Sequence, residues 1–366
     1  MKNTFGNNIS VTIFGESHGE AIGAVVDGLT PGIEVDEEFI KHQLNLRRPS
    51  GSISTSRQES DPFNIVSGVY NGKTTGTPIA IIIPNENTKS KDYESMKYLL
   101  RPGHADYTAY EKYHGFQDTR GGGHFSGRIT APLVAAGAII ISALRKKGIY
   151  IGTHIKKCAG ISDADFSDNL KDEILKLSNS EFAVLDNSAE DKMKEAILNA
   201  KSKGDSVGGI LETAILGVPA GVGEPWFDSV ESMLSHILFG IPAIKGVEFG
   251  KGFEMADMTG SQANDAFYTE NGKVYTKTNS NGGINGGITN GMPIIFRCAV
   301  KPTPTIFVEQ DTVSIDTMTN TKIKPEGRHD PAIIHRARVV ADSVSAIVIA
   351  DMLATKYGTD YLGDIK

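Results

Sequence analysis

The sequence predicts an α+β fold, in which long helices are mixed with many short strands. Two apolar segments, residues 128–148 and 331–358, are long enough to form buried helices. Strand-like segments bounded by Gly, Pro and Asn fill much of the remaining chain, without the regular βαβ alternation of a parallel sheet. No linker-like stretch interrupts the 366 residues, so we expect one domain over residues 1–366.

The individual elements follow from turn residues and helix ends. Residues 10–29 predict two strands around a turn at 15–19, and residues 63–85 predict two strands around a glycine turn. Residues 34–48 predict a helix that ends in basic residues, which are favourable at a helix C-terminus. Further helices are expected at 107–115, 188–203 and 227–241, and further strands at 149–160, at the start of 206–225, and at 246–250, 272–278 and 292–302. Residues 162–204 are acidic and rich in lysine, and nothing in them indicates chemistry.

Composition and charge argue against several classes of protein. A net charge of −7 argues against general affinity for nucleic acid. The two cysteines, Cys158 and Cys298, form no CxxC motif, so neither a disulfide framework nor a zinc site is expected. The N-terminus does not resemble a signal peptide, and no apolar run is expected to reach transmembrane length, residues 131–148 coming nearest. We therefore expect a cytoplasmic protein without nucleic-acid or membrane partners.

Arginine is distributed unevenly along the chain. Of 37 basic residues only 11 are arginine, and none of these lies between residues 146 and 296, although lysine is frequent there. Most arginines fall in segments rich in Gly, Pro or His. A guanidinium group binds carboxylate or phosphate through two parallel hydrogen bonds, so the pattern predicts anion recognition. The alternative is structural, because loop arginines also brace carboxylates of neighbouring loops.

Histidines stand beside glycines in two segments. The motif GESHG (15–19) places His18 on a turn, where an imidazole either donates a proton to a leaving group or simply bonds to backbone. His104, His114 and His124 recur every ten residues in the second segment, 101–128. HExxH is absent and no carboxylate cluster completes a metal shell, so no metal is expected. We interpret His114 as structural.

Glycine-rich and basic loops supply further candidates. RGGGHFSGR (120–128) places exposed amides at the start of a helix beside Arg120 and Arg128, which predicts an anion pocket or, alternatively, a simple glycine hinge. SNGGINGGITNG (280–291) is a second glycine-rich loop without P-loop or dinucleotide spacing. KPTPT (301–305) adds a lysine and two hydroxyls, and GRHDP (327–331) places Asp330 before a long helix as an N-cap or a base. Together these loops predict a polyanionic substrate or a phosphorylated cofactor.

In their order along nearly the whole chain, these motifs resemble the chorismate synthase family. The segments that carry the resemblance are GESHG…IGAVVDGLTPG, RRP, TTGTPIAI, LRPGHADYT, RGGG-x-x-SGR, GDSVGG, GVPAGVGEP, KGVEFGKGF, SNGGINGGI, KPTPTI and GRHDP. The family removes phosphate and a proton from 5-enolpyruvylshikimate 3-phosphate to give chorismate, and it requires reduced FMN (FMNH2) without net redox change. The resemblance implies a β-α-β sandwich with long central helices and flanking antiparallel sheets. It also implies a homotetramer, an association with NADP, and an external flavin reductase as the source of reduced FMN.

The resemblance implies roles for single residues as well. His18 would protonate the departing phosphate, His104 would manage the protonation of the flavin, and Asp330 would help to remove a proton near flavin N5. Substrate contacts are implied for Arg47, Arg48, Arg128 and Arg338. FMN contacts are implied for His124, Phe125, Ser126, Gly286, Lys301, Pro302, Thr303, Pro304, Thr305 and Arg328.

Several positions depart from the family pattern. His124 and Phe125 stand where the family often has arginine and serine, and Ile129 stands where it often has glutamate. Pro242 replaces an asparagine expected near the flavin, and the loop after Arg48 is one residue shorter and lacks an arginine. We therefore predict that FMN affinity is altered in this chain.

Two other functions stay open from the residues alone. A protein that only binds a phosphosugar or nucleotide would explain the arginines and glycines, but not why His18, His104 and Asp330 each lie beside glycine or arginine. A phosphohydrolase or kinase would act on phosphate without flavin, but the sequence has no P-loop, nucleophile elbow or metal cluster.

Overall fold

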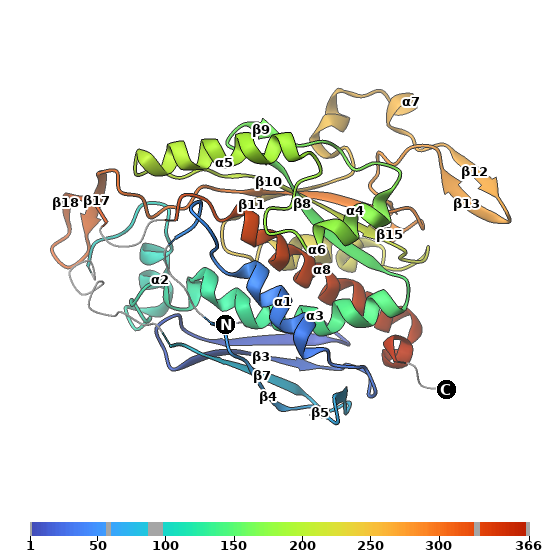
Figure 1. Cartoon of the computed structure of the whole chain (residues 1–366), viewed down its shortest axis with the longest axis horizontal. Coiled ribbons are helices and arrows are strands. Elements are labelled where there is room, and N and C mark those ends of the chain that lie inside the picture. The colour runs from blue at the N-terminus through green and yellow to red at the C-terminus, as the bar shows by residue number, and fades with distance from the viewer. Residues whose placement is uncertain (1, 56–59, 87–97, 326–329, 364–366) are drawn as a thin grey trace.

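Two five-stranded sheets enclose a layer of helices in the computed structural model, which describes residues 2–55, 60–86, 98–325 and 330–363 (Figure 1). The strand order is β1-β2-β3-β7-β4 in the first sheet and β11-β16-β10-β8-β9 in the second. Every pair of neighbouring strands in both sheets is antiparallel. The arrangement confirms the predicted α+β fold with long central helices and flanking antiparallel sheets.

The first sheet buries one face against the helices. Its strands are β1 (Thr4–Phe5), β2 (Ser10–Gly15), β3 (Ala21–Asp27), β7 (Ile79–Pro84) and β4 (Asn64–Ser67). Along β7, buried residues alternate with half-buried ones, as expected for a strand with one face on the core. In the β2–β3 pair Gly15 lies opposite Ile22, so residues 16–20 form the turn at one end of the sheet.

Four helices form the central layer: α1 (Glu37–Arg47), α3 (Thr130–Lys146), α6 (Val230–Leu238) and α8 (Ile334–Tyr357). Helices α3 and α8 cross closely because small residues meet there. A Cβ atom built on Gly137 would lie 2.4 Å from Cβ of Ser343, so only glycine fits at this crossing without a shift. Helix α1 begins after Asp36, whose carboxylate accepts a hydrogen bond from the backbone N–H of Phe39 at 2.9 Å.

The second sheet lies between α8 on its inner face and α4 (Leu170–Leu177) on its outer face. Its strands are β8 (Tyr150–Cys158), β9 (Ile161–Ser162), β10 (Gly209–Leu216), β11 (Ile244–Phe249) and β16 (Ile294–Val300). On the inner face, the Thr153 hydroxyl donates to the Asp342 carboxylate of α8 at 2.6 Å. On the outer face, Leu170 and Ile174 of α4 pack on Ala214 of β10. Helix α5 (Asn187–Ser202) covers the β9 edge of this sheet (Figure 1).

Short elements extend from these layers. The two-stranded hairpins are β5 (Val69–Tyr70) with β6 (Lys73–Thr74), β12 (Phe267–Glu270) with β13 (Lys273–Thr276), β14 (Ile284–Asn285) with β15 (Ile288–Thr289), and β17 (Gln310–Ser314) with β18 (Thr319–Ile323). The short helices are α2 (Asp106–Tyr113) and α7 (Gly260–Ala263), and 3₁₀ turns occur at Gly123–Phe125, Gly127–Ile129, Trp226–Asp228, Gly252–Asp257 and Thr359–Leu362. Helix α2 and the β17–β18 hairpin lie at one end of the long axis, and β12–β13 lies at the other (Figure 1).

The segment that contains α3 corrects one expectation from the sequence. Within the described ranges, Gly127–Lys146 is the one helical segment long and apolar enough to cross a membrane by length and composition. The expectation that no apolar run is long enough is therefore wrong. In its most apolar window 83% of the residues are buried inside the protein, because α3 packs against α1, α8 and the first sheet.

Candidate functional site

A cavity of about 970 Å³ opens where the first sheet, the start of α8 and several loops meet. This volume lies near the upper end of the range for small-molecule sites, about 300–1,000 Å³. Its wall draws side chains from distant parts of the sequence, and its charged and imidazole side chains are Lys2, His18, Arg47, Arg101, His104, His124, Arg128, His236, Lys245, Lys301, Asp330 and Arg336. Most of the predicted site residues are therefore brought together in one place.

His18 lies in the β2–β3 turn and is packed against the glycine loop 121–123. A Cβ atom on Gly121 would lie 2.4 Å from the imidazole Cε1, and this residue has a φ of +66°, so glycine is required here for two reasons. The backbone N–H of Ser17 donates to the carbonyl of Gly123 at 3.1 Å, and the Ser17 hydroxyl lies 3.1 Å from Nδ1 of His18. Two motifs about a hundred residues apart thus build one wall of the cavity.

Arg47 and Arg128 share a single buried carboxylate. Nη2 of Arg47 donates to Oδ2 of Asp61 at 2.8 Å, and Arg128 forms an ion pair with Oδ1 of the same side chain, which is fully buried. Burial raises the pKa of Asp61, but the two guanidinium groups outweigh burial and hold the pKa below its usual range. Two cations on one anion leave a net positive charge at the cavity wall. Sequence reasoning missed Asp61.

The predicted substrate contact Arg48 does not line the cavity. Its guanidinium group donates to the backbone carbonyl of Ser60, and Nε lies 3.7 Å from Asp61. Arg48 therefore braces the segment that carries Asp61, which is the structural role left open for loop arginines.

His104 belongs to a second cluster of charges, beside the start of α2. Nδ1 of His104 lies 2.7 Å from Oδ1 of Asp106. Arg101 holds the same carboxylate through both Nη2 (2.7 Å) and Nε (2.8 Å). His104 and Arg101 line the cavity, whereas Asp106 lies behind them. Arg101 and Asp106 were not predicted as site residues, although both lie in the LRPGHADYT segment.

The start of α8 gives the clearest correction. Arg338, the predicted substrate contact, does not line the cavity: its side chain is 1% exposed, it donates to the carbonyl of Ser180, and Nη1 lies 3.5 Å from Oδ2 of Asp342. Arg336 lines the cavity and forms an ion pair with Asp330, which also lines it. Two residues along an α-helix correspond to about 200° of rotation, so the two arginines face opposite sides.

Some of the residues predicted to bind FMN line the cavity, and others do not. Lys301 donates to the carbonyl of Gly103, which holds the KPTPT segment beside the loop of His104. Pro302 and Gly286 do not line the cavity, and Gly286 lies in the turn of the β14–β15 hairpin. Arg328 falls outside the described residues. The predicted FMN contacts that do line the cavity are His124, Phe125, Ser126, Lys301, Thr303, Pro304 and Thr305.

The loop 122–128 is held on the first sheet by its own side chains. Nδ1 of His124 donates to the carbonyl of Gly15 at 2.8 Å, and Oγ of Ser126 accepts from the backbone N–H of Arg128 at 3.2 Å. Pro242, like His124 and Phe125, lines the cavity, whereas Ile129 is buried in the core. Of the four residues named as departures in the sequence, three are thus in the wall of the site.

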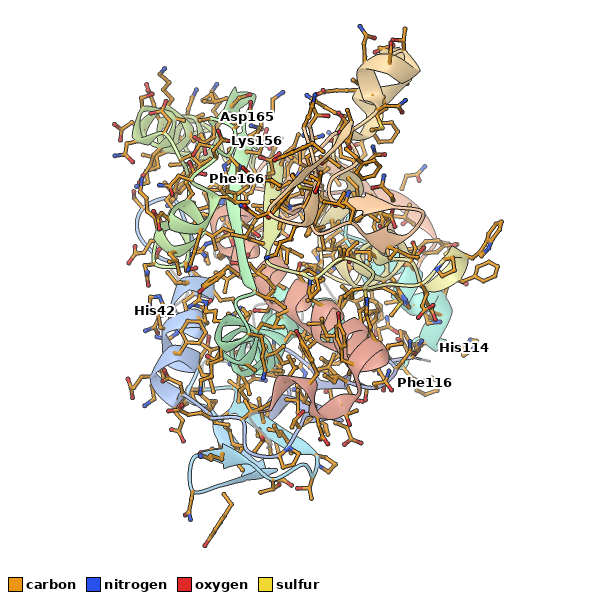
Figure 2. The ribbon with its side chains drawn as sticks, turned by 90° about the vertical axis from the view of Figure 1, so that its right-hand side faces the viewer. His42, His114, Phe116, Lys156, Asp165 and Phe166 are labelled. Carbon is orange, nitrogen blue, oxygen red and sulfur yellow. The ribbon has the colours of Figure 1, made fainter. Side chains whose placement is uncertain are left out.

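The structure places His114 at the end of α2, outside the cavity. His114 is exposed, has a φ of 55°, and ends α2 in the left-handed conformation typical of a helix C-terminus. Figure 2 shows His114 and Phe116 at the opposite edge of the molecule from Lys156, Asp165 and Phe166. Among the residues that the structure describes, no group of three His, Cys, Asp or Glu side chains is arranged to hold a metal ion.

Fold and site together define an α+β protein whose central cavity is rich in cations and is lined by imidazole side chains and a carboxylate. A family model described as chorismate synthase matches residues 9–354. Chorismate synthase of Thermococcus kodakarensis is 45% identical over 348 residues, which are 95% of this chain and 96% of the relative. The enzyme of Methanobrevibacter smithii is 47% identical over 353 residues, 96% of each chain. A crystal structure of chorismate synthase matches with a TM-score of 0.76 and 31% identity, over 98% of this chain and 94% of the other. The chain belongs to the chorismate synthase family.

Proposed function

We propose that this chain catalyses the anti-1,4-elimination of phosphate and a proton from 5-enolpyruvylshikimate 3-phosphate, giving chorismate for aromatic amino acid biosynthesis. The observation that carries the proposal is the joining of His18 and His104 with several cations in one cavity. The activity is that of a carbon–oxygen lyase, and it depends on reduced FMN without net redox change.

The charge of the cavity suits a substrate with one phosphate and two carboxylates. Seven lysine and arginine side chains line the cavity within the described ranges, and Asp330 is the one acid among its described lining residues. Even when Asp61 and Asp106 behind the wall are counted, the cations are in excess by four. Guanidinium groups bind carboxylate and phosphate through paired hydrogen bonds, so Arg336, Arg128 and Arg101 are the proposed substrate anchors.

The wall also suits reduced FMN. The hydroxyl of Thr303 and Nε of Arg336 are buried polar atoms without a hydrogen-bond partner, so both are available to a ligand. Phe125 and Pro304 offer apolar surface, and Ser126, Lys301 and Thr305 offer polar groups. When bound, the flavin would supply the transient electron density that loosens the C–O bond. These residues would hold it beside His104 and Asp330.

His18 is the proposed acid for the departing phosphate. The Ser17 hydroxyl lies against its Nδ1, and Gly121 packs on the ring, so the imidazole is held in one orientation. A general acid fixed in this way contributes about 10²–10⁴-fold in rate. His104 would hold a proton at the cofactor, and Asp330 would accept one near flavin N5.

An anaerobic assay tests the proposal. The protein is mixed with 5-enolpyruvylshikimate 3-phosphate and chemically reduced FMN, and chorismate absorbance and phosphate release are followed together. We expect both products with reduced FMN and neither with oxidised FMN. His18→Ala should lower kcat by about 10²-fold or more, whereas His114→Ala, an exposed histidine outside the cavity, should leave it unchanged.

Other outcomes would favour the alternative functions. Phosphate without chorismate would indicate a hydrolase. Tight binding of both ligands without any product, and no effect of His18→Ala on binding, would indicate a protein that only binds.

The assembly and supply of cofactor form a second part of the proposal. A cytoplasmic homotetramer is proposed, supported by the resemblance and by the large exposed aromatic side chains of Trp226, Phe227 and Phe253, which are 84–89% exposed. The mass in solution, measured by light scattering, tests the tetramer. An external reductase is proposed to supply reduced FMN, so NADPH and oxidised FMN alone should give no turnover until a flavin reductase is added.

A further inference from the structure

Asp106 occupies an unusual position between a cavity histidine and a cavity arginine. It is the first residue of α2, and its carboxylate contacts His104 Nδ1 at 2.7 Å through Oδ1. Arg101 contacts the same carboxylate: Nη2 donates to Oδ1 at 2.7 Å, and Nε and the backbone N–H donate to Oδ2 at 2.8 and 2.9 Å. Asp106 does not line the main cavity, so it acts on a ligand through His104 and Arg101.

The contacts fix which imidazole nitrogen carries hydrogen. Burial raises the pKa of Asp106, but the hydrogen bonds from Arg101 and His104 outweigh burial and hold the pKa well below its usual range. The carboxylate is therefore ionised and only accepts hydrogen bonds, so Nδ1 of His104 must donate. Nη2 of Arg101 lies 3.2 Å from the same Nδ1, and it cannot donate to a nitrogen that already carries hydrogen. Nε2 is left as the nitrogen available to a ligand.

We propose that Asp106 is a positioning residue that holds His104 as its Nδ1–H tautomer, with Nε2 available to the cavity, and that Arg101 locks this carboxylate in place. Asp106 corresponds to the aspartate of a catalytic triad, a carboxylate that orients an imidazole and does not react itself. The catalytic consequence rests on the proposed function, because it assigns His104 a proton-transfer step there. The tautomer itself does not depend on that function.

A neighbouring ion pair shows what is specific about Asp106. Asp118 and Arg120 form the same type of two-point contact, at 2.8 and 2.9 Å. Among the described residues, the hydrogen bonds of that carboxylate come from the side chain and backbone N–H of Arg120, and none comes from an imidazole. The bond to His104 is therefore the feature that separates Asp106 from an ordinary loop ion pair.

The test uses two substitutions of Asp106 and a control on the same helix. Asp106→Asn keeps the size but replaces one acceptor oxygen by a donor, and Asp106→Glu keeps the charge. Glu111→Gln removes an exposed carboxylate from α2 without touching His104. Nitrogen-15 correlation spectra of the ligand-free protein, with His104→Ala to assign the signal, report the tautomer of the neutral ring.

We expect the wild type and Glu111→Gln to give the Nδ1–H form of His104, and Asp106→Asn to lose that preference. In the anaerobic assay, Asp106→Asn should lower kcat by about 10²-fold with KM changed less than about threefold, and Asp106→Glu should restore part of kcat. An unchanged His104 tautomer in folded Asp106→Asn would overturn the proposal, whatever its activity. If the wild type itself gives no chorismate while the tautomer shifts as expected, the proposed function fails and the positioning role stands.

Discussion

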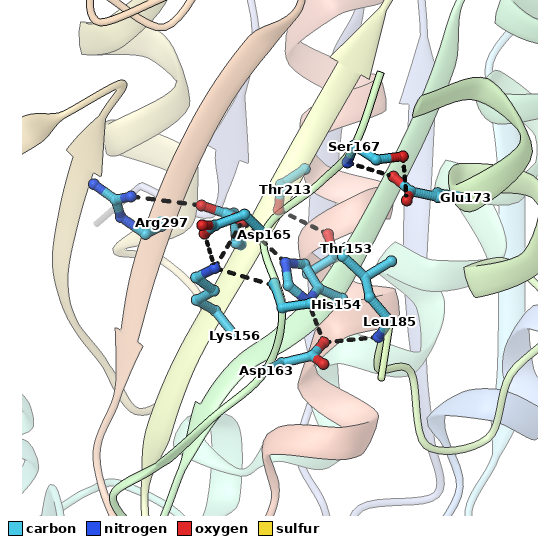
Figure 3. A network of polar contacts seen from close by, with 12 residues as sticks. Thr153, His154, Lys156, Asp163, Asp165, Ser167, Glu173, Leu185, Thr213 and Arg297 are labelled. Carbon is cyan, nitrogen blue, oxygen red and sulfur yellow. Dashed lines mark hydrogen bonds and ion pairs between the residues drawn. The ribbon is translucent and has the colours of Figure 1, made fainter. Parts of the chain in front are cut away.

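Two regions of the molecule concentrate charge, and they differ in what the charges face. The first is the cavity. The second, which we call the charge ladder, runs across the outer face of the second sheet and consists of His154, Glu212, Arg297 and Glu248. Figure 3 shows two of these residues, His154 and Arg297, with Asp163 beside His154. Glu212 lies opposite His154 on one side and opposite Arg297 on the other, and Arg297 lies opposite Glu248.

In the charge ladder every charge meets an opposite one. Nε2 of His154 lies 2.9 Å from Glu212 and Nδ1 lies 2.7 Å from Asp163, while Nε of Arg297 lies 2.6 Å from Glu248. Asp163, which is not itself a ladder residue, also accepts a hydrogen bond from the backbone N–H of Leu185 at 2.7 Å, so its contact with His154 ties the segment before α5 to the sheet. None of the four ladder residues lines the cavity.

The cavity has the opposite balance. Its cations outnumber its acids, and a buried polar atom of Arg336 has no hydrogen-bond partner. A density of charged residues therefore does not by itself indicate a functional site. What distinguishes the cavity is an excess of one sign of charge around an open volume, which an anionic ligand can balance.

The sharpest way to test this comparison is to break the ladder at His154. Its fully buried ring has both nitrogens bonded to carboxylates, so His154→Ala removes the imidazolium from Asp163 and leaves Glu212 with only the longer contacts to Arg297 (3.5 Å) and Lys156 (3.9 Å). Breaking a buried ion pair costs about 3–5 kcal/mol, and we expect the free energy of unfolding to fall by this amount. Urea denaturation measures the loss, and kcat per folded molecule should stay unchanged. A stable His154→Ala protein with impaired turnover would mean that the ladder takes part in function.

A pair of arginines on one helix sharpens the comparison further. Arg336→Gln removes a cation from the cavity wall, and a charged hydrogen bond is worth about 1.5–3 kcal/mol, so KM for the substrate should rise about 10- to 100-fold. Arg338→Gln, two residues along α8, breaks the buried contact with Asp342 and should lower the free energy of unfolding instead. Steady-state kinetics of both variants measure KM, and urea denaturation of both variants measures the free energy of unfolding. A rise in KM for folded Arg338→Gln alone would reverse the assignment of the two side chains.

The sequence predicts which loops form the site, but it does not predict which of these two arginines lines the cavity. The loops that meet at the cavity were recognisable because glycine, arginine and histidine gather in them. The choice between Arg336 and Arg338 depends on the rotation of α8 about its axis, and no residue in the sequence reports that rotation. Asp61 was missed because its partners, Arg47 and Arg128, lie 14 and 67 residues away.

The fold was predictable where apolar segments are long. Helices α3 and α8 were predicted because their apolar residues extend over many turns. Helix α4 was missed, although Leu170, Ile174 and Leu177 are buried with the i, i+4, i+7 spacing of a helix face. The β17–β18 hairpin was missed because its strands are mostly polar and lie at the surface, with a left-handed turn at Met318 that glycine usually provides.

Two buried histidines should give the free energy of unfolding opposite dependences on pH. Burial lowers the pKa of His154, but hydrogen bonds to Asp163 and Glu212 outweigh burial and raise it above its usual value of about 6.5. The stabilisation by His154 is therefore complete below about pH 6.5 and is lost as pH rises through the folded value. Burial and nearby cations lower the pKa of His335 to about 3. The contribution of neutral His335 to the free energy of unfolding is therefore complete above about pH 6.5 and is lost as pH falls toward 3.

The measurement is urea denaturation of the wild type, His154→Gln and His335→Gln across this range. The difference between wild type and His154→Gln should shrink as pH rises, and the difference for His335→Gln should shrink as pH falls, each by at most about 1.4 kcal/mol per pH unit. Parallel trends for the two variants would contradict a charged His154 and a neutral His335 in the folded protein.

The smallest expected effect concerns a departure from the family pattern in the cavity wall. Phe125 is 37% exposed, lies edge-on to Tyr113 with ring centroids 6.1 Å apart, and lines the cavity. If it supplies apolar surface to the flavin, Phe125→Ser should weaken FMN binding by about 0.5–1.5 kcal/mol, or roughly 2- to 10-fold. Anaerobic titration of reduced FMN measures the dissociation constant.

Phe116→Ser is the matched control, because Phe116 is 91% exposed and lies outside the cavity. Since both variants exchange the same two residue types, a difference between them reports the position of the ring and not its chemistry. Equal FMN affinity in wild type, Phe125→Ser and Phe116→Ser would mean that the flavin does not rest on Phe125. The departure at this residue would then reflect packing against Tyr113 of α2, and the cofactor would be held from the KPTPT side of the cavity.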